Sequence, residues 1–128
     1  MKITVKQAVR AYLALEAMAK EDIKVSPGVG MCLIRLKRKL KPEMESFAEA
    51  EQKLVQQYAE RDENGDIQWV EQGRFAITPE QGEAYLRDLE EISNAEIKLL
   101  IDPIDIRGED IRLGLEAIEA LDGLVIME

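Results

Sequence analysis

Histidine is absent from this chain of 128 residues, and its absence removes several kinds of catalytic site at once. A Ser–His or Cys–His nucleophile pair needs an imidazole base, and the usual zinc sites combine His with Cys. Carboxylates are the side chains that remain for acid–base or divalent-metal chemistry. Pairs at helical spacing occur at Glu45 with Glu49 and at Glu80 with Glu83. Such pairs are typical of solvated helix faces, which we favour over a carboxylate-based metal enzyme.

Neither of the loop types that hold metals or phosphates is complete in the sequence. Residues 62–66, Asp-Glu-Asn-Gly-Asp, begin like a calcium loop but lack its spacing and its closing Glu. The glycines form neither a Gly-x-Gly-x-x-Gly nor a Walker-type loop. Cys32 is the one cysteine, and its position between Met31 and Leu33 predicts a buried, inert thiol. We therefore predict that the protein is not an enzyme, with no catalytic residue, cofactor or metal.

Two features could instead bind another protein. Five bases fall within residues 35–41, and they form either a solvated face paired with acids such as Glu43 and Glu45 or a docking site for an acidic partner or an anion. Trp69, the only tryptophan, either packs on a helix, which we favour, or anchors an interface. The candidate protein-binding residues are Leu33, Arg35, Leu36, Arg38, Lys39, Leu40, Trp69 and Phe75.

The charge of the chain narrows the class of partner. With 26 acidic and 17 basic residues the net charge is −9, which argues against general affinity for nucleic acid or anionic lipid. No apolar run approaches the roughly 20 residues that cross a bilayer, and residues 1–5 do not resemble a signal peptide. We expect a cytoplasmic protein with no membrane partner and no direct contact with nucleic acid.

A single helical pattern runs through residues 26–62. Ser26 followed by Pro27 is typical of a helix start, and Pro42 predicts a kink or a break near Leu40. We favour the kink because the apolar spacing continues in phase. A homodimer is the simplest way to cover so long an apolar face. That face carries Val29, Leu33, Leu36, Leu40, Met44, Phe47, Leu54 and Tyr58, with Glu51 at the one missed position.

The remaining elements are short, and together with the long helix they predict one α+β domain, mainly helical, over residues 1–128. We expect a small antiparallel sheet that joins a β-hairpin to the strand of residues 97–106 and is extended by the N-terminal strand. Residues 124–127 form an apolar tail that must be buried or bound. The other predicted elements are a strand at residues 1–5, a hairpin from residues 67–70 and 74–77, and helices at residues 5–20, 79–94 and 115–121.

Two of these helices have clear start signals. Thr4 with Gln7, and Thr78 with Gln81, have the spacing of a capping box. The apolar side of the first helix is predicted to include Val5, Ala8, Val9, Tyr12, Leu13 and Leu15 or Glu16, and that of the second Tyr85, Leu86, Leu89 and Ile92.

The order of these elements resembles a known family. The Met-Lys-Ile start, the charged helix that ends in residues 58–65 (Tyr-Ala-Glu-Arg-Asp-Glu-Asn-Gly), the hairpin around Gly73 and the segments at residues 96–99 and 117–121 are similar to small phage and prophage proteins of Gram-positive bacteria. That family has no assigned function. The resemblance implies a phage context and supplies no site residue.

Two functions remain open. The first is a non-enzymatic protein-binding module that acts through the long helix and the hairpin, as an assembly or morphogenesis factor or as an inhibitor of a host protein. The second is an acidic mimic of nucleic acid that blocks a host DNA-binding defence or transcription protein. The mimic requires acids on one continuous surface, which the bases of residues 35–41 would interrupt.

Overall fold

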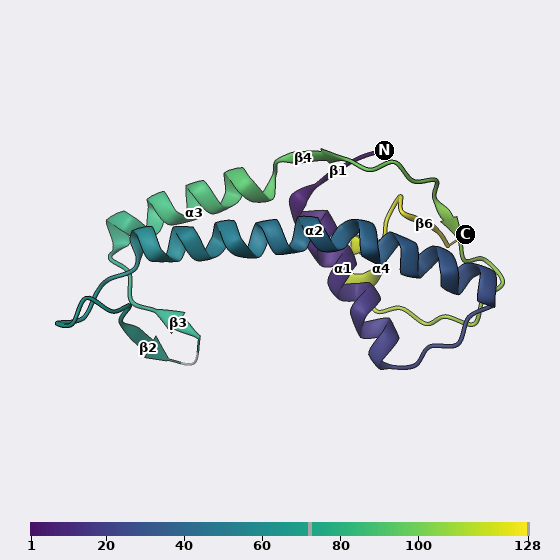
Figure 1. The fold of residues 1–128 in the computed structure, drawn as a ribbon, viewed down its shortest axis with the longest axis horizontal. Helices are drawn as coiled ribbons and strands as arrows, with labels where there is room; N and C mark the ends of the chain where they lie inside the picture. The colour runs from purple at the N-terminus through teal and green to yellow at the C-terminus, as the bar shows by residue number, and fades with distance from the viewer. Residues whose placement is uncertain (72, 128) are drawn as a thin grey trace. The chain divides into compact units, whose positions relative to one another are not determined.

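The structure is a computed structural model that describes residues 1–71 and 73–127. Its architecture is α+β and mainly helical, which confirms the predicted fold class (Figure 1). The chain divides into two compact units, and each is described by itself: unit 1 comprises Met1–Glu45 and Glu96–Glu128, and unit 2 comprises Ser46–Ala95. That the whole chain is a single domain stays a prediction. Within the described residues, no helix combines the length and the apolar character needed to cross a membrane.

Unit 1 begins with a strand that pairs with a distant part of the chain. Strand β1 (Lys2–Thr4) is antiparallel to β4 (Glu96–Lys98), with Ile3 opposite Ile97. Helix α1 (Val5–Lys20) follows directly, and its N-cap Thr4 accepts a hydrogen bond from the Gln7 amide at 3.1 Å, as predicted. The Gln7 side chain does not return to Thr4 to complete a capping box. It donates instead to the Asp122 carbonyl at 2.8 Å, which ties α1 to the end of helix α4 (Leu115–Ala120).

Helix α2 (Pro27–Tyr58) is continuous through Pro42, so a break there is wrong, and the kink stays a prediction. The helix contributes residues up to Glu45 to unit 1 and residues from Ser46 onward to unit 2. Its start differs from the prediction in one respect. The Ser26 side chain, expected to cap the helix, donates to the Glu109 carboxylate, while the Ser26 carbonyl accepts from Gly30 N at 2.9 Å. The loop after β5 (Ile104–Asp105) is thereby held against the beginning of α2.

The hydrophobic core of unit 1 draws on every one of its segments. Leu36 and Leu40 of α2 are 1% and 0% exposed. The apolar tail is buried as predicted, because β6 (Val125–Ile126) pairs in parallel with β5 and Leu124 is 0% exposed. The side of α1 that faces the core carries Ala8, Ala11, Tyr12, Leu15 and Met18. Leu13 was predicted on that side and is 52% exposed, because the buried stripe runs through Ala11 and Tyr12 instead.

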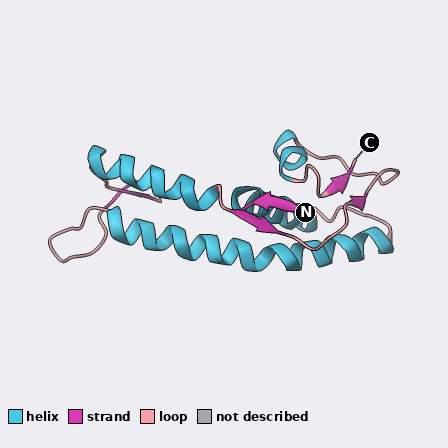
Figure 2. Cartoon of the chain, turned by 90° about the horizontal axis from the view of Figure 1, so that it is seen from above, coloured by secondary structure: helices cyan, strands magenta, loops and turns pink. Residues whose placement is uncertain are grey.

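Unit 2 pairs two helices and a hairpin. Helix α3 (Pro79–Ser93) lies alongside the second half of α2 in both views (Figures 1 and 2), and the Thr78 hydroxyl accepts from Gln81 N at 3.3 Å as the start signal predicted. Strands β2 (Trp69–Glu71) and β3 (Arg74–Phe75) form the predicted hairpin. Gln72, predicted in its turn, lies outside the described residues. The turn of residues 62–66 is built on Asp62, whose Oδ1 accepts from the amides of Asn64 and Asp66.

The prediction of one sheet is wrong. Among the described residues the strands form three separate pairs: β1 with β4, β2 with β3, and β5 with β6. Residues 97–106 were predicted as a strand broken at Asp102 and Pro103, and the structure has two separate strands there, β4, which begins at Glu96, and β5. Proline has no amide hydrogen to donate to a ladder, so each half of this segment finds its own partner, one in each end of the chain.

Shortening Leu40 to alanine tests the core directly. We expect Leu40→Ala to lower the free energy of unfolding by about 2–5 kcal/mol, because a fully buried side chain is replaced by a cavity. Leu13→Ala is the matched control, since it removes the same atoms from a side chain that is 52% exposed, and we expect a change within about 0.5 kcal/mol. Urea denaturation of both variants measures the difference, and equal losses would contradict the assigned core.

Candidate functional site

The eight candidate protein-binding residues fall in two separate places. Six of them lie on the part of α2 in unit 1, and Trp69 and Phe75 lie on the hairpin of unit 2. Leu36 and Leu40 are core residues, so their proposed role in a docking surface is wrong. They face the core because the i, i+4 positions of α2 meet α1 and the C-terminal segments there. A homodimer through residues 29–58 would therefore lack its two central side chains.

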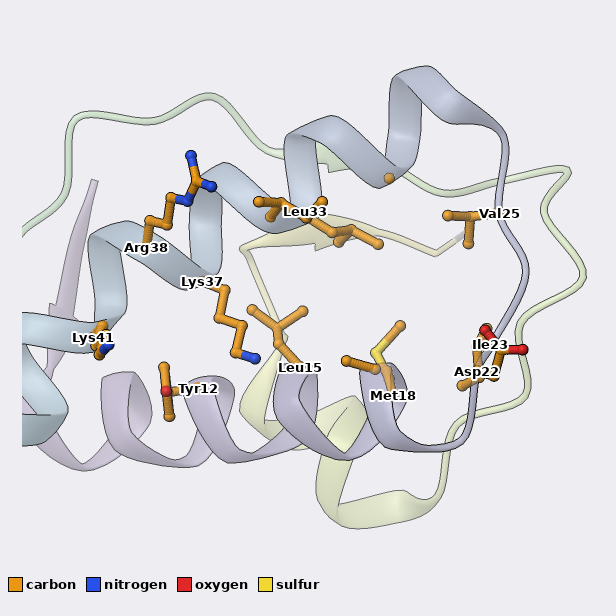
Figure 3. A pocket seen from close by; sticks show the side chains of 13 residues that line it. Tyr12, Leu15, Met18, Asp22, Ile23, Val25, Leu33, Lys37, Arg38 and Lys41 are labelled. Carbon is orange, nitrogen blue, oxygen red and sulfur yellow. The ribbon is translucent and has the colours of Figure 1, made fainter.

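Leu33 and Arg38 line a cavity in unit 1. The cavity has a volume of 490 Å³ and lies between α1, the connection that follows α1, and the first half of α2 (Figure 3). Its apolar wall includes Leu15 and Met18 of α1, which are 5% and 9% exposed. The sequence did not reveal this site. Its other walls come from Tyr12, Ile23 and Val25. No single periodic pattern joins these residues to the five bases of residues 35–41, which we call the basic cluster.

Three cations of the basic cluster stand at the same cavity: Lys37, Arg38 and Lys41. The Lys37 ammonium lies 5.6 Å from the centre of the Tyr12 ring, a cation–π contact. Lys41 has a carboxylate near it, Glu45 Oε1 at 3.9 Å, in a solvent-exposed pair that contributes little. Within the described residues, no carboxylate lies within 4.0 Å of Lys37 or Arg38. The predicted pairing of the cluster with neighbouring acids is thus limited to Lys41.

Arg35 and Lys39 lie at a different hollow of unit 1. Lys39 Nζ donates to the Leu100 carbonyl at 2.6 Å, which fixes part of the chain after β4 against α2. Cys32 shares this hollow and is exposed, so the prediction of a buried thiol is wrong. Position 32 is one residue out of phase with the buried stripe that passes through Leu33 and Leu36.

Trp69 and Phe75 lie together in unit 2, as the first two members of an aromatic row. Their rings meet edge to face at 6.5 Å, the Phe75 ring meets Tyr85 of α3 at 5.3 Å, and the Tyr85 ring meets Tyr58 of α2 at 6.3 Å. Trp69 is nevertheless 59% exposed. The prediction that Trp69 packs in the core is wrong. Its indole meets the Phe75 ring edge to face, and most of its surface stays in water.

Two further apolar side chains are exposed beside this row. Val70 is 65% exposed and follows Trp69 in the strand, and Leu86 is 62% exposed and follows Tyr85 in the helix. Leu86 was predicted to face inward, but α3 has no fully buried residue. Successive side chains of a strand point to opposite faces. Because Trp69 and Val70 are consecutive in β2, the sequence alone could have predicted that one of them is exposed.

The negative charge of the chain is concentrated in unit 2. Residues 46–95 contain 12 acidic and 4 basic side chains, a net charge of −8. The rest of the chain contains 14 acidic and 13 basic side chains, a net charge of −1. Trp69, Val70 and Leu86 therefore belong to a strongly acidic unit, whereas the bases of residues 35–41 belong to a nearly neutral one.

The carboxylate pairs seen in the sequence do not gather into a site. Glu45 and Glu49 lie near Lys41 and Lys53, at 3.9 Å and 3.6 Å, along the exposed side of α2. Over residues 1–71 and 73–127, no group of three Asp, Glu or Cys side chains lies close enough to hold a metal ion.

One acid of unit 2 has a clear electrostatic effect. Asp88 Oδ2 accepts a hydrogen bond from the Tyr58 hydroxyl at 2.5 Å. This bond, with smaller contributions from desolvation and from the charge of Asp88, raises the pKa of Tyr58 above its ordinary value. The contact fixes α3 to α2 at the end of the aromatic row.

No protein-family model matches this chain, and neither a curated protein nor a solved structure shows significant similarity to it.

Replacing Asp88 tests the contact between α2 and α3. We expect Asp88→Asn to lower the pKa of Tyr58 toward the ordinary value for tyrosine, because the charged acceptor is removed. The hydrogen bond stabilises the fold below the ordinary tyrosine pKa and is lost as the pH rises through the raised value. Tyrosine ring chemical shifts followed by NMR measure the titration. Asp66→Asn is the control, and an equal response in both variants would contradict the assignment.

Proposed function

We propose that this chain is a non-enzymatic protein-binding module of a phage or prophage and that it contacts its partner through the hairpin of unit 2. The observation that carries the proposal is the exposure of Trp69, at 59%, on a short hairpin whose Phe75 supports the indole from one edge. The phage context is supported by the resemblance of the element order to small phage and prophage proteins. The cytoplasm of the bacterial host is the expected location.

Trp69 has the character of an interface anchor. Tryptophan is among the residues that most often dominate binding energy when a partner covers them. Val70 and Leu86 are also exposed, at 65% and 62%, but Val70 follows Trp69 in the strand and points to the opposite face, so the anchor assigned here is Trp69. The aromatic row from Phe75 to Tyr58 holds the hairpin on the two helices, so little conformational entropy is lost when Trp69 is bound.

The charge of unit 2 specifies the partner's chemistry. A net charge of −8 over 50 residues attracts a basic surface and repels nucleic acid and other acidic proteins. The partner is therefore a phage or host protein with a basic patch that surrounds an apolar pocket. In a phage this suits an assembly or morphogenesis factor, or an inhibitor of a host protein.

The same charge distribution favours one second candidate, the acidic mimic of nucleic acid. The bases of residues 35–41 belong to unit 1, so within unit 2 they do not interrupt the acids. A mimic would bind a host DNA-binding protein through carboxylates and would not need Trp69. The two candidates therefore predict different sensitive residues.

Capture of a partner by tagged protein, followed by titration with the purified partner, separates the two candidates. For the module we expect Trp69→Ala to weaken binding by about 30-fold or more, the effect of losing a hot-spot residue. Leu115→Ala, which truncates an 81% exposed leucine of unit 1, is the matched control and should bind as the parent does. Affinity should also fall as salt is raised.

Two results would contradict the proposal of a protein-binding module that acts through Trp69. One is equal binding by Trp69→Ala and Leu115→Ala. The other is full binding by Trp69→Ala together with loss of binding in the double variant Glu80→Lys, Glu83→Lys, which is the result that the nucleic-acid mimic predicts.

A further inference from the structure

The cavity of unit 1 has two chemically different ends. Lys37 and Lys41 stand at one end, near Tyr12, whereas the guanidinium of Arg38 is directed away from Tyr12 (Figure 3). The walls toward the other end are formed by Leu15, Met18, Ile23, Val25 and Leu33. Its volume of 490 Å³ lies within the range of about 300–1,000 Å³ found for small-molecule sites. A ligand that fills the cavity therefore needs an anionic group at the end near the lysines and an apolar chain along the aliphatic walls.

Lys37 is the group that points most directly to an anionic head. Its side chain is half-buried and extends from α2 toward α1, between Tyr12 and Leu15 (Figure 3). The ammonium contacts the Tyr12 ring face at 5.6 Å, and none of the described carboxylates lies within 4.0 Å of it. A half-buried cation without a counter-charge gains more from a bound anion than an exposed one does, because less water screens the interaction.

The other end of the cavity limits the ligand to one charge. Asp22 lies there with Ile23, at the turn after α1. A second negative charge on the ligand would meet this carboxylate, so the tail must be neutral and apolar. This excludes an acidic peptide with charges along its length, and it favours a molecule with a single anionic group on an aliphatic chain.

We propose that unit 1 binds an anionic amphiphile of the free fatty-acid type, with the carboxylate at Lys37, near Lys41, and the aliphatic chain between Leu15, Met18 and Val25. This site is independent of the hairpin of unit 2 and of the proposed protein partner. It assigns a role to the bases that the docking surface on unit 2 leaves unused.

The test is calorimetric titration of the full chain with decanoate below its micelle concentration, compared with octanoate and decanol. We expect saturable binding of decanoate at one site, about fifteenfold tighter than octanoate, since each buried methylene contributes a factor of about four. Decanol, which has the same chain without the charge, should bind at least fivefold more weakly. These comparisons use the unaltered protein and do not depend on any variant folding.

A matched pair of variants locates the head group. Lys37→Met keeps the aliphatic stem and removes the charge. We expect this variant to bind decanoate at least fivefold more weakly than the parent does and to bind decanol with unchanged affinity. Lys53→Met makes the same change on an exposed lysine of α2 that does not line the cavity, and it should bind as the parent does. Absence of saturable decanoate binding, equal affinity for decanol and decanoate, or equal affinity in the two variants would each overturn the proposal.

Discussion

The burial of Leu36 and Leu40 is the constraint on which unit 1 depends. These two side chains of α2 are almost wholly removed from water, and the groups that cover them come from both ends of the chain. Ile3 and α1 arrive from the N-terminal side, and Leu99, Ile106, Leu121 and Leu124 from the C-terminal side. Leu36 and Leu40 are therefore not available to a second copy of the protein, because the chain itself covers them.

Unit 2 is organised differently. Its helices meet mainly through partly buried side chains and an aromatic row, and Ala59 is the one residue described as buried between Ser46 and Ala95. Trp69 and Leu86 are largely exposed to water. Most of the negative charge of the chain lies in the same 50 residues. Unit 2 thus combines a thin core with an exposed tryptophan and a large excess of acids.

Local sequence signals predicted the helices well. Thr4 and Thr78 cap α1 and α3 as expected, Pro27 begins α2, and the apolar spacing kept α2 continuous through Pro42. These features depend on residues within one or two turns of each other, so the sequence contains the information. The predicted hairpin and the burial of the C-terminal tail also hold for the residues described.

The errors all concern contacts between distant segments. The expected association of the N-terminal strand with residues 97–106 holds, because β1 pairs with β4. The sequence could not show that the hairpin would stay apart or that β5 would pair with the tail, since the strands have only two or three residues and weak preferences. Leu13 and Cys32 were misplaced because apolar residues flank the buried stripe of each helix and periodicity alone does not choose among them. Leu86 was misplaced because α3 has no fully buried residue. The cavity was missed for the same reason, because Lys37 and Tyr12 meet only after α1 and α2 are packed.

Unit 1 has a well-buried core, whereas unit 2 is only thinly packed. Hydrogen–deuterium exchange of the free protein, followed by NMR for each amide, measures this difference. We expect slow exchange in α1 and the first half of α2, and faster exchange in the hairpin and α3, because local opening is easiest where few apolar contacts are buried. Equal protection of α3 and α1 would contradict it.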